Sequence, residues 1–178
     1  GFLGTVLNQF LKLLCRIPRP WVLDPDFTIV ESARAEATGY SFPSGHTQNA
    51  VGTFGGIARA TKRHCLRWVC VVIFVLVSFS RMYLGVHTPL DVGVSFVIAA
   101  VLVFAIYPLM RRADRYPRLM AGLLASMVLL SAAYLTFTLV YPFPPDIDSA
   151  NLASGVENGW KLLGATLGIA LAWWLDRQ

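Results

Sequence analysis

Three short stretches of the sequence hold polar residues that could act together on one phosphate group. They are Lys12–Pro20, Pro43–His46 and Ser80–Asp91, and each lies at the end of an apolar segment. Together they supply histidines, a carboxylate and cations at membrane depth, where ionisable groups are costly and mark functional sites. An enzyme that acts on an anionic membrane substrate is therefore the first hypothesis.

The composition is typical of a membrane protein. Of the 178 residues, 56% are hydrophobic and 14% are charged, whereas soluble domains carry about 25% charged residues. The net charge of +5 arises mainly from two basic clusters between apolar runs, at 59–67 and 111–118. Clusters of this kind are typical of cytoplasmic loops and fix membrane orientation. We therefore interpret the charge as a topology signal and expect no nucleic-acid partner.

The apolar segments predict an all-α fold, a polytopic transmembrane helix bundle within one membrane-embedded domain over 1–178. Several segments approach the roughly 20 residues needed to cross the hydrocarbon, and uninterrupted apolar runs in lipid form helices. The chain opens inside the first segment and has its first methionine at Met82, so we expect a truncated N-terminus. The predicted segments are 1–17, 44–61, 66–85, 89–110, 118–141 and 160–176.

The charges of the connecting loops place the three polar stretches on one side of the membrane. Loops 20–43 and 141–159 are net acidic, whereas the turn near 62–65 and the loop 111–118 are basic. Basic loops tend to stay in the cytoplasm, so all three stretches fall on the non-cytoplasmic side. Loop 20–43, which contains prolines and a glycine, is expected to form a lid or a short interfacial helix.

The stretch Ser44-Gly45-His46 could begin a helix that faces an anion. Ser44 is a favoured N-cap residue, and Gly45 permits close approach to the backbone. The free N–H groups of the first turn would then point at an anion, with His46 on the same turn. A capped helix with an incidental histidine explains these residues equally well.

His87 and Asp91 flank the predicted start of another helix. Thr88 suits the N-cap and Pro89 the first helical position, which puts Asp91 where a capping box needs an acid. Alternatively, Asp91 accepts the Nδ1–H of His87, which would fix the tautomer and leave Nε2 as a nucleophile. Both interpretations put the two side chains close together, and the sequence leaves both open.

Lys12, Arg19 and Arg81 lie at the outer ends of predicted helices. Each cation by itself is explained by snorkelling to water. The positive-inside tendency, however, disfavours cations on this side, so three of them indicate an anionic partner. Phosphate suits both the planar fork of arginine and the point charge of lysine.

Taken together, the three stretches resemble the three-part signature of the type 2 phosphatidic acid phosphatase (PAP2) superfamily. Order and internal spacing both match, over about half of the chain. A Pro-Ser-Gly-His tetrapeptide alone would be weak, whereas all three motifs in order are specific. The resemblance implies a membrane-embedded lipid phosphatase that needs no metal and no cofactor. The matching residues are Lys12-x6-Arg19-Pro20, Pro43-Ser44-Gly45-His46 and Ser80-Arg81-x5-His87-x3-Asp91.

The resemblance also implies a role for each of these residues. His87 would attack phosphorus and form a phosphohistidine, with Asp91 orienting the ring. His46 would protonate the leaving group and then activate water. The remaining residues would hold the phosphate oxygens and stabilise the pentavalent transition state; they are Lys12, Arg19, Ser44, Gly45 and Arg81.

One feature departs from the membrane members of that superfamily, in which the helix after the histidine motif is the last of a six-helix core. Here two further apolar segments follow it, at 118–141 and 160–176. We expect these accessory helices either to shape the path by which lipid enters or to form the contact of a homo-oligomer.

The leading hypothesis is an integral membrane phosphatase of the bacterial plasma membrane, with its active site facing outward. Its substrate would be a lipid phosphate or diphosphate: undecaprenyl diphosphate, phosphatidylglycerol phosphate or phosphatidic acid. Two alternatives stay open, a lipid phosphotransferase with the same phosphohistidine and a non-catalytic membrane protein that binds lipid phosphates. The presence of His46, His87 and Asp91 disfavours the second alternative.

Overall fold

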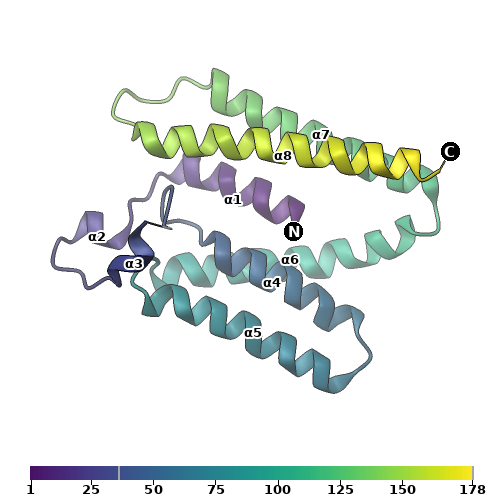
Figure 1. Ribbon diagram of the computed structural model, residues 1–178, viewed down its shortest axis with the longest axis horizontal. Coiled ribbons are helices and arrows are strands. Elements are labelled where there is room, and N and C mark those ends of the chain that lie inside the picture. The colour runs from purple at the N-terminus through teal and green to yellow at the C-terminus, as the bar shows by residue number, and fades with distance from the viewer. Residues whose placement is uncertain (36, 178) are drawn as a thin grey trace. The chain divides into compact units, whose positions relative to one another are not determined.

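The computed structural model describes residues 1–35 and 37–177, which form α-helices and no β-strand (Figure 1). The predicted all-α class is confirmed. The helices are α1 (Phe2–Cys15), α2 (Pro20–Leu23), α3 (Glu31–Arg34), α4 (Gly45–Ala60), α5 (His64–Tyr83), α6 (Pro89–Ala113), α7 (Pro117–Val140) and α8 (Ser149–Leu175).

The chain divides into two compact units. Unit 1 consists of Gly1 and Leu3–Tyr107, and unit 2 of Phe2 and the chain from Pro108 onward. The boundary falls inside α6, at a proline that has no N–H for the helix. Since the three polar motifs all lie in unit 1, that unit holds the candidate site. The prediction of a single domain over the whole chain stays a prediction.

In unit 1, α4 packs along α5, and the two helices are joined by a basic turn. Arg67 donates from Nε to the carbonyl oxygen of Ala58 at 3.2 Å, and Arg59 lies over the ring of Phe104 at 4.5 Å. Figure 1 shows this turn at the opposite end of α4 and α5 from the loop that carries α2 and α3. The basic cluster and the polar motifs are therefore at opposite ends of the same helices.

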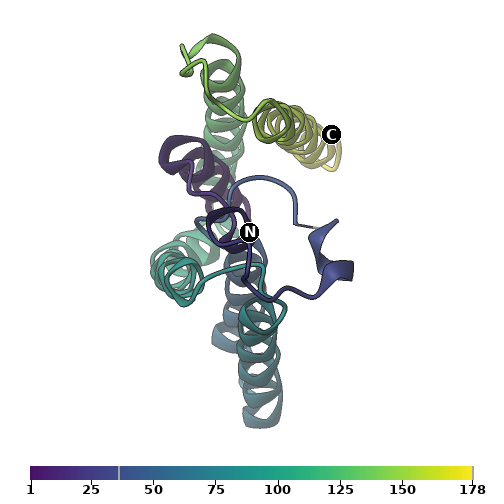
Figure 2. The ribbon, with the colours of Figure 1, turned by 90° about the vertical axis from the view of Figure 1, so that its left-hand side faces the viewer.

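The predicted loop 20–43 contains two single-turn helices, α2 and α3, and Figure 2 views unit 1 from this end. The loop is fastened to the turn after α5, because Val30 donates its N–H to the carbonyl oxygen of Leu84 at 3.2 Å. Gly85 in that turn has a φ of +72°, a conformation that glycine adopts without steric cost. The loop at Thr28–Val30 therefore lies against the turn that leads to His87.

Unit 2 is an antiparallel pair, α7 and α8. Gly159 lets the helices approach closely, since a Cβ there would lie 3.0 Å from Leu135 Cδ1. The buried Tyr134 hydroxyl donates to the carbonyl oxygen of Gly155 at 3.2 Å. Small residues and interhelical hydrogen bonds of this kind favour association of helices in lipid.

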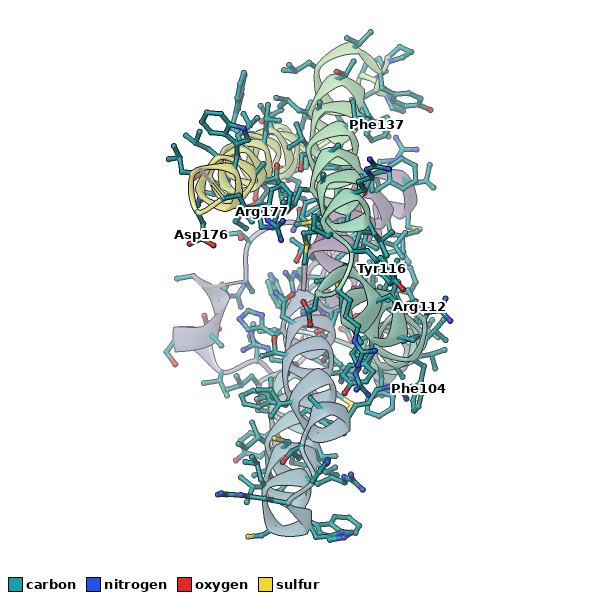
Figure 3. The ribbon with its side chains drawn as sticks, turned by 90° about the vertical axis from the view of Figure 1, so that its right-hand side faces the viewer. Phe104, Arg112, Tyr116, Phe137, Asp176 and Arg177 are labelled. Carbon is teal, nitrogen blue, oxygen red and sulfur yellow. The ribbon has the colours of Figure 1, made fainter. Side chains whose placement is uncertain are left out.

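Figure 3 shows the ends of the helices of unit 2. Arg112 and Tyr116 lie at the turn between α6 and α7, and Asp176 and Arg177 lie at the end of α8. The guanidinium of Arg177 is 4.6 Å from the ring centroid of Trp173. Basic and aromatic side chains at a helix end are typical of the membrane–water interface.

Within the described part of the chain, three helices are long and apolar enough to cross a membrane: α5, α6 and α7. Of the two accessory segments predicted to span, α7 is among these three and α8 is not. Glu157 and Lys161 lower the hydropathy of the first half of α8. The prediction that α8 starts near 160 is wrong, because the helix begins at Ser149, where Asp148 accepts the N–H of Asn151 at 2.9 Å.

Candidate active site

The described contacts centre on His87, which lies in the turn between α5 and α6. Its imidazole is buried, and its two nitrogens have different neighbours. Nε2 is 3.0 Å from Nη1 of Arg19, whereas Nδ1 is 3.5 Å from Oδ2 of Asp91. A guanidinium can only donate, so Nε2 must accept and the proton of the neutral ring must be on Nδ1.

Asp91 satisfies both interpretations that the sequence left open. Its Oδ2 accepts the N–H of Thr88 at 2.8 Å, and Thr88 Oγ1 accepts the N–H of Asp91 at 3.2 Å. These two bonds are the reciprocal pair of a capping box. The same Oδ2 faces the Nδ1–H of His87, so the residue that caps α6 is also placed to orient the imidazole.

Arg19 is held by loop carbonyls that only the tertiary structure brings together. Its Nε donates to Gly39 at 3.0 Å, its Nη2 to Thr38 at 2.8 Å and its Nη1 to Val86 at 2.8 Å. Burial lowers the pKa of Arg19 to about 10, so the guanidinium is charged at neutral pH. The result is a fixed cation directly in front of Nε2 of His87.

Burial lowers the pKa of His87 from 6.5 to about 4, and the charges of Arg19 and Lys12 act in the same direction. The hydrogen bond and the charge of Asp91 oppose this shift. Because the effects that lower the pKa outweigh those that raise it, His87 is neutral near pH 7. A neutral imidazole whose Nε2 lone pair faces the cation is the protonation state that a nucleophile requires.

The other two cations lie close to the same loop segments. Lys12, on α1, is buried and donates to the carbonyl oxygen of Tyr40, next to the Gly39 carbonyl that holds Arg19. Arg81, in the last turn of α5, accepts the N–H of Val86 with its own carbonyl at 3.2 Å. The Nε of Arg81 is buried and has no hydrogen-bond partner among the described residues.

The start of α4 is tied directly to the start of α6. Ser44 is the N-cap of α4, and its Oγ accepts the N–H of Thr47 at 3.5 Å. The N–H of Ser44 itself donates to the main-chain carbonyl of Asp91 at 3.3 Å. Gly45 and His46 follow in the first turn, and the His46 side chain is exposed. The helix terminus predicted to bind an anion therefore lies next to the residues around His87.

Two polar neighbours of the motif residues were missed by sequence reasoning. Ser41 donates from Oγ to Oδ2 of Asp91 at 2.6 Å, and nothing in its sequence context indicates this contact. Asn8 donates from Nδ2 to the carbonyl of Pro43 at 3.1 Å and to Oε1 of Gln48 at 2.8 Å. Asn8 lies four residues before Lys12, on the same face of α1. An asparagine in an apolar segment is a signal of a buried hydrogen bond, and here that bond holds the main chain at Pro43.

Within residues 1–35 and 37–177, no three or more His, Cys, Asp and Glu side chains are grouped so that they could hold a metal ion. The site consists of cations, hydroxyls, main-chain groups, a neutral imidazole and the Asp91 carboxylate that faces this imidazole. Such a set can bind an oxyanion and present a nitrogen nucleophile to it.

A family model, described as the PAP2 superfamily, matches residues 2–115, which is more than half of the chain. The chain belongs to the PAP2 superfamily, and the resemblance seen in the motifs is confirmed.

Three curated proteins are similar to part of this chain. The chain is 35% identical over 107 residues to undecaprenyl-diphosphatase BcrC of Bacillus subtilis (60% of this chain, 52% of the relative). It is 31% identical over 117 residues to phosphatidylglycerophosphatase B of the same organism (60% and 56%). An undecaprenyl-diphosphatase of Sulfolobus acidocaldarius is 33% identical over 92 residues (51% and 42%).

The chain thus spans about half the length of the curated relatives that it matches. No solved structure matches it significantly. Family membership is therefore shown for the part that contains the three motifs.

Proposed function

We propose that the protein is an integral membrane phosphatase that hydrolyses a lipid phosphate or diphosphate through a phosphohistidine on Nε2 of His87. The observation that carries this proposal is the pairing of His87 Nε2 with Arg19 Nη1 at 3.0 Å. It combines a neutral, oriented nucleophile with a cation at the position where a phosphoryl oxygen would bind. The names of the relatives support lipid phosphates as the substrate class.

The reaction would proceed in two steps. A phosphoryl oxygen first replaces Nε2 as the acceptor of Arg19 Nη1, which frees the nitrogen lone pair. Nε2 then forms a bond to phosphorus as the bond to the leaving oxygen breaks, and His46 gives that oxygen a proton. In the second step His46 takes a proton from water, whose oxygen attacks phosphorus and breaks the P–N bond.

The cations and the start of α4 would stabilise the transition state. Arg19, Lys12 and Arg81 supply positive charge, and Ser44 and Gly45 lie where first-turn N–H groups meet an anion. Charge on the equatorial oxygens is greatest in the transition state, so fixed donors act there more strongly than in the ground state. Arg19 is already held by three carbonyls, so little reorganisation is needed.

We further propose that the site faces outward from a bacterial plasma membrane. In unit 1, Arg59, Lys62, Arg63 and Arg67 gather around the turn between α4 and α5, at the opposite end of these helices from His87. Basic turns favour the cytoplasmic side, which leaves the site on the other side. The head groups within its reach would then be those of the outer leaflet.

The test is phosphate release by detergent-purified protein. The panel consists of undecaprenyl diphosphate, phosphatidylglycerol phosphate and phosphatidic acid, each in the presence of EDTA. Release that resists EDTA and disappears in His87→Ala is the expected result. His64→Ala is the matched control, because His64 is exposed at the start of α5 in the basic turn, and it should keep wild-type activity.

Two outcomes would contradict the proposal. Substantial release by a folded His87→Ala variant would rule out the phosphohistidine. Phosphate that reaches an added lipid acceptor, with none released to water, would make the protein a phosphotransferase with the same nucleophile.

A further inference from the structure

Ser41 comes from the loop between α1 and α4, yet its side chain is fully buried against the start of α6. Its N–H donates to the carbonyl oxygen of Ile17 at 2.8 Å, which fixes the main chain, and its residue exposure is 1%. The hydroxyl Oγ is 2.6 Å from Oδ2 of Asp91. This is the short distance of a charge-assisted O–H···O⁻ bond.

The same hydroxyl also faces His87. Nδ1 of His87 is 3.5 Å from Ser41 Oγ and 3.5 Å from Asp91 Oδ2, so the three atoms form a narrow triangle. An ionised carboxylate only accepts, which commits the Ser41 proton to Asp91. The lone pairs of Oγ are then available to the Nδ1–H of His87, at a distance equal to that of the carboxylate itself.

We propose that Ser41 is a positioning residue of the active site, whose hydroxyl bridges the Nδ1–H of His87 to the carboxylate of Asp91. The inference rests on the proposed role of His87 as the nucleophile. Two acceptors at equal distance define the plane of the ring better than one does. They aim Nε2 at the phosphate without putting a proton on it.

Asp91 has two other contacts, and neither of them involves the ring of His87. Oδ2 also accepts the N–H of Thr88 at 2.8 Å, a bond that serves the helix cap. The hydroxyl of Ser95 donates to the main-chain carbonyl of Asp91 at 2.7 Å and does not involve the carboxylate. Of the two serine hydroxyls, only that of Ser41 bonds to the carboxylate.

Ser95→Ala is therefore a matched control for Ser41→Ala. Both serines are buried and both bond to Asp91, so generic effects of removing a buried hydroxyl should be similar. In Ser41→Ala we expect kcat to fall by about 10- to 100-fold, the effect of losing a hydrogen bond to a charged group. KM should change by less than about twofold, since no phosphate contact is lost. Ser95→Ala should leave both constants near wild type.

A second readout does not depend on turnover. In protein labelled with ¹⁵N-histidine, the two neutral tautomers have distinct nitrogen shifts, and a His87→Gln variant identifies the signals of His87. We expect the wild-type ring to be in the Nδ1–H form at pH 7. Arg19 and Asp91 keep this tautomer in Ser41→Ala, so the loss of one acceptor should appear as a changed shift of the Nδ1–H signal of His87. If no substrate is hydrolysed by the wild type, the proposed function fails, while the Nδ1–H signal of His87 still decides the role of Ser41.

The proposal is overturned if Ser41→Ala keeps the wild-type kcat and the wild-type Nδ1–H shift of His87, or if Ser95→Ala loses as much kcat as Ser41→Ala does. It is also overturned if the loss appears in KM alone. Should Ser41→Ala fail to fold, Ser41→Cys replaces it under the same criteria, because a thiol keeps the volume and is a much weaker donor.

Discussion

Replacing Gly85 by alanine tests the link between loop 20–43 and the turn that carries His87. A Cβ at Gly85 would lie 2.6 Å from the carbonyl oxygen of Thr28 and 3.2 Å from Cα of Ile29. The first distance is well inside van der Waals contact and involves main-chain atoms, so no side-chain rotation can relieve it. The φ of +72° adds a conformational cost for any residue with a Cβ.

The expected destabilisation follows from these two effects. A left-handed conformation costs an alanine roughly 1 to 2 kcal/mol, and overpacking a tight contact costs about 1 to 3 kcal/mol. We therefore expect Gly85→Ala to lower the free energy of unfolding by about 2 to 5 kcal/mol. Since Val86 and His87 follow directly, kcat should also fall.

The measurement is thermal unfolding in detergent, with Gly93→Ala as the matched control. Gly93 lies in α6 with open space around its Cα, so alanine there should raise stability by up to about 1 kcal/mol. Gly85→Asn separates the two effects, because asparagine tolerates a positive φ but still carries the clashing Cβ. If Gly85→Ala were as stable as wild type, loop 20–43 would not be fastened to this turn.

Two further predictions concern Arg19 and His87. Arg19→Lys keeps the charge but cannot reproduce a fork with four acceptors, so kcat/KM for phosphate release should fall roughly 100-fold. The control is Arg34→Lys, at an exposed ion pair with Glu31, which should stay near wild type. Equal activity of the two variants would contradict the proposed role of Arg19 in binding phosphate. The pKa of His87 is lowered from 6.5 to about 4 in the folded protein, so between these values the unfolded chain binds the proton and the folded chain does not. Stability should therefore rise with pH across this window, by up to about 3 kcal/mol. Melting temperatures between pH 4 and pH 7 test this prediction. If the melting temperature of the wild type rises with pH no more steeply than that of His87→Gln, the lowered pKa of His87 is refuted.

The sequence predicted most helices to within a few residues, because local signals determine them. Prolines at the first helical position begin α6 and α7 at 89 and 117, near the predicted 89 and 118. Ser44 caps α4 as expected. Apolar runs between such signals form helices in lipid, so composition together with these local signals was sufficient.

The start of α8 was predicted wrongly for a physical reason. Residues 149–159 contain glycines, asparagines and a glutamate, which lower the hydropathy that marked the other segments. Their helix is stabilised by the Asp148 cap and by packing of Gly155 and Gly159 against α7. A hydropathy pattern does not register such contacts between helices.

The sequence by itself determined which residues could bind and attack a phosphate, because their types and spacings lie within three short motifs. It also determined that Asp91 lies near His87, since a capping box brings Asp91 back to Thr88, the next residue after His87. Only the tertiary structure decided that carbonyls of Thr38, Gly39 and Val86 hold Arg19 in front of Nε2. The same is true of Ser41, which reaches Asp91 across 50 positions. Contacts of this kind depend on how a loop packs against the ends of helices, and the local spacing of residues in the sequence does not predict that packing.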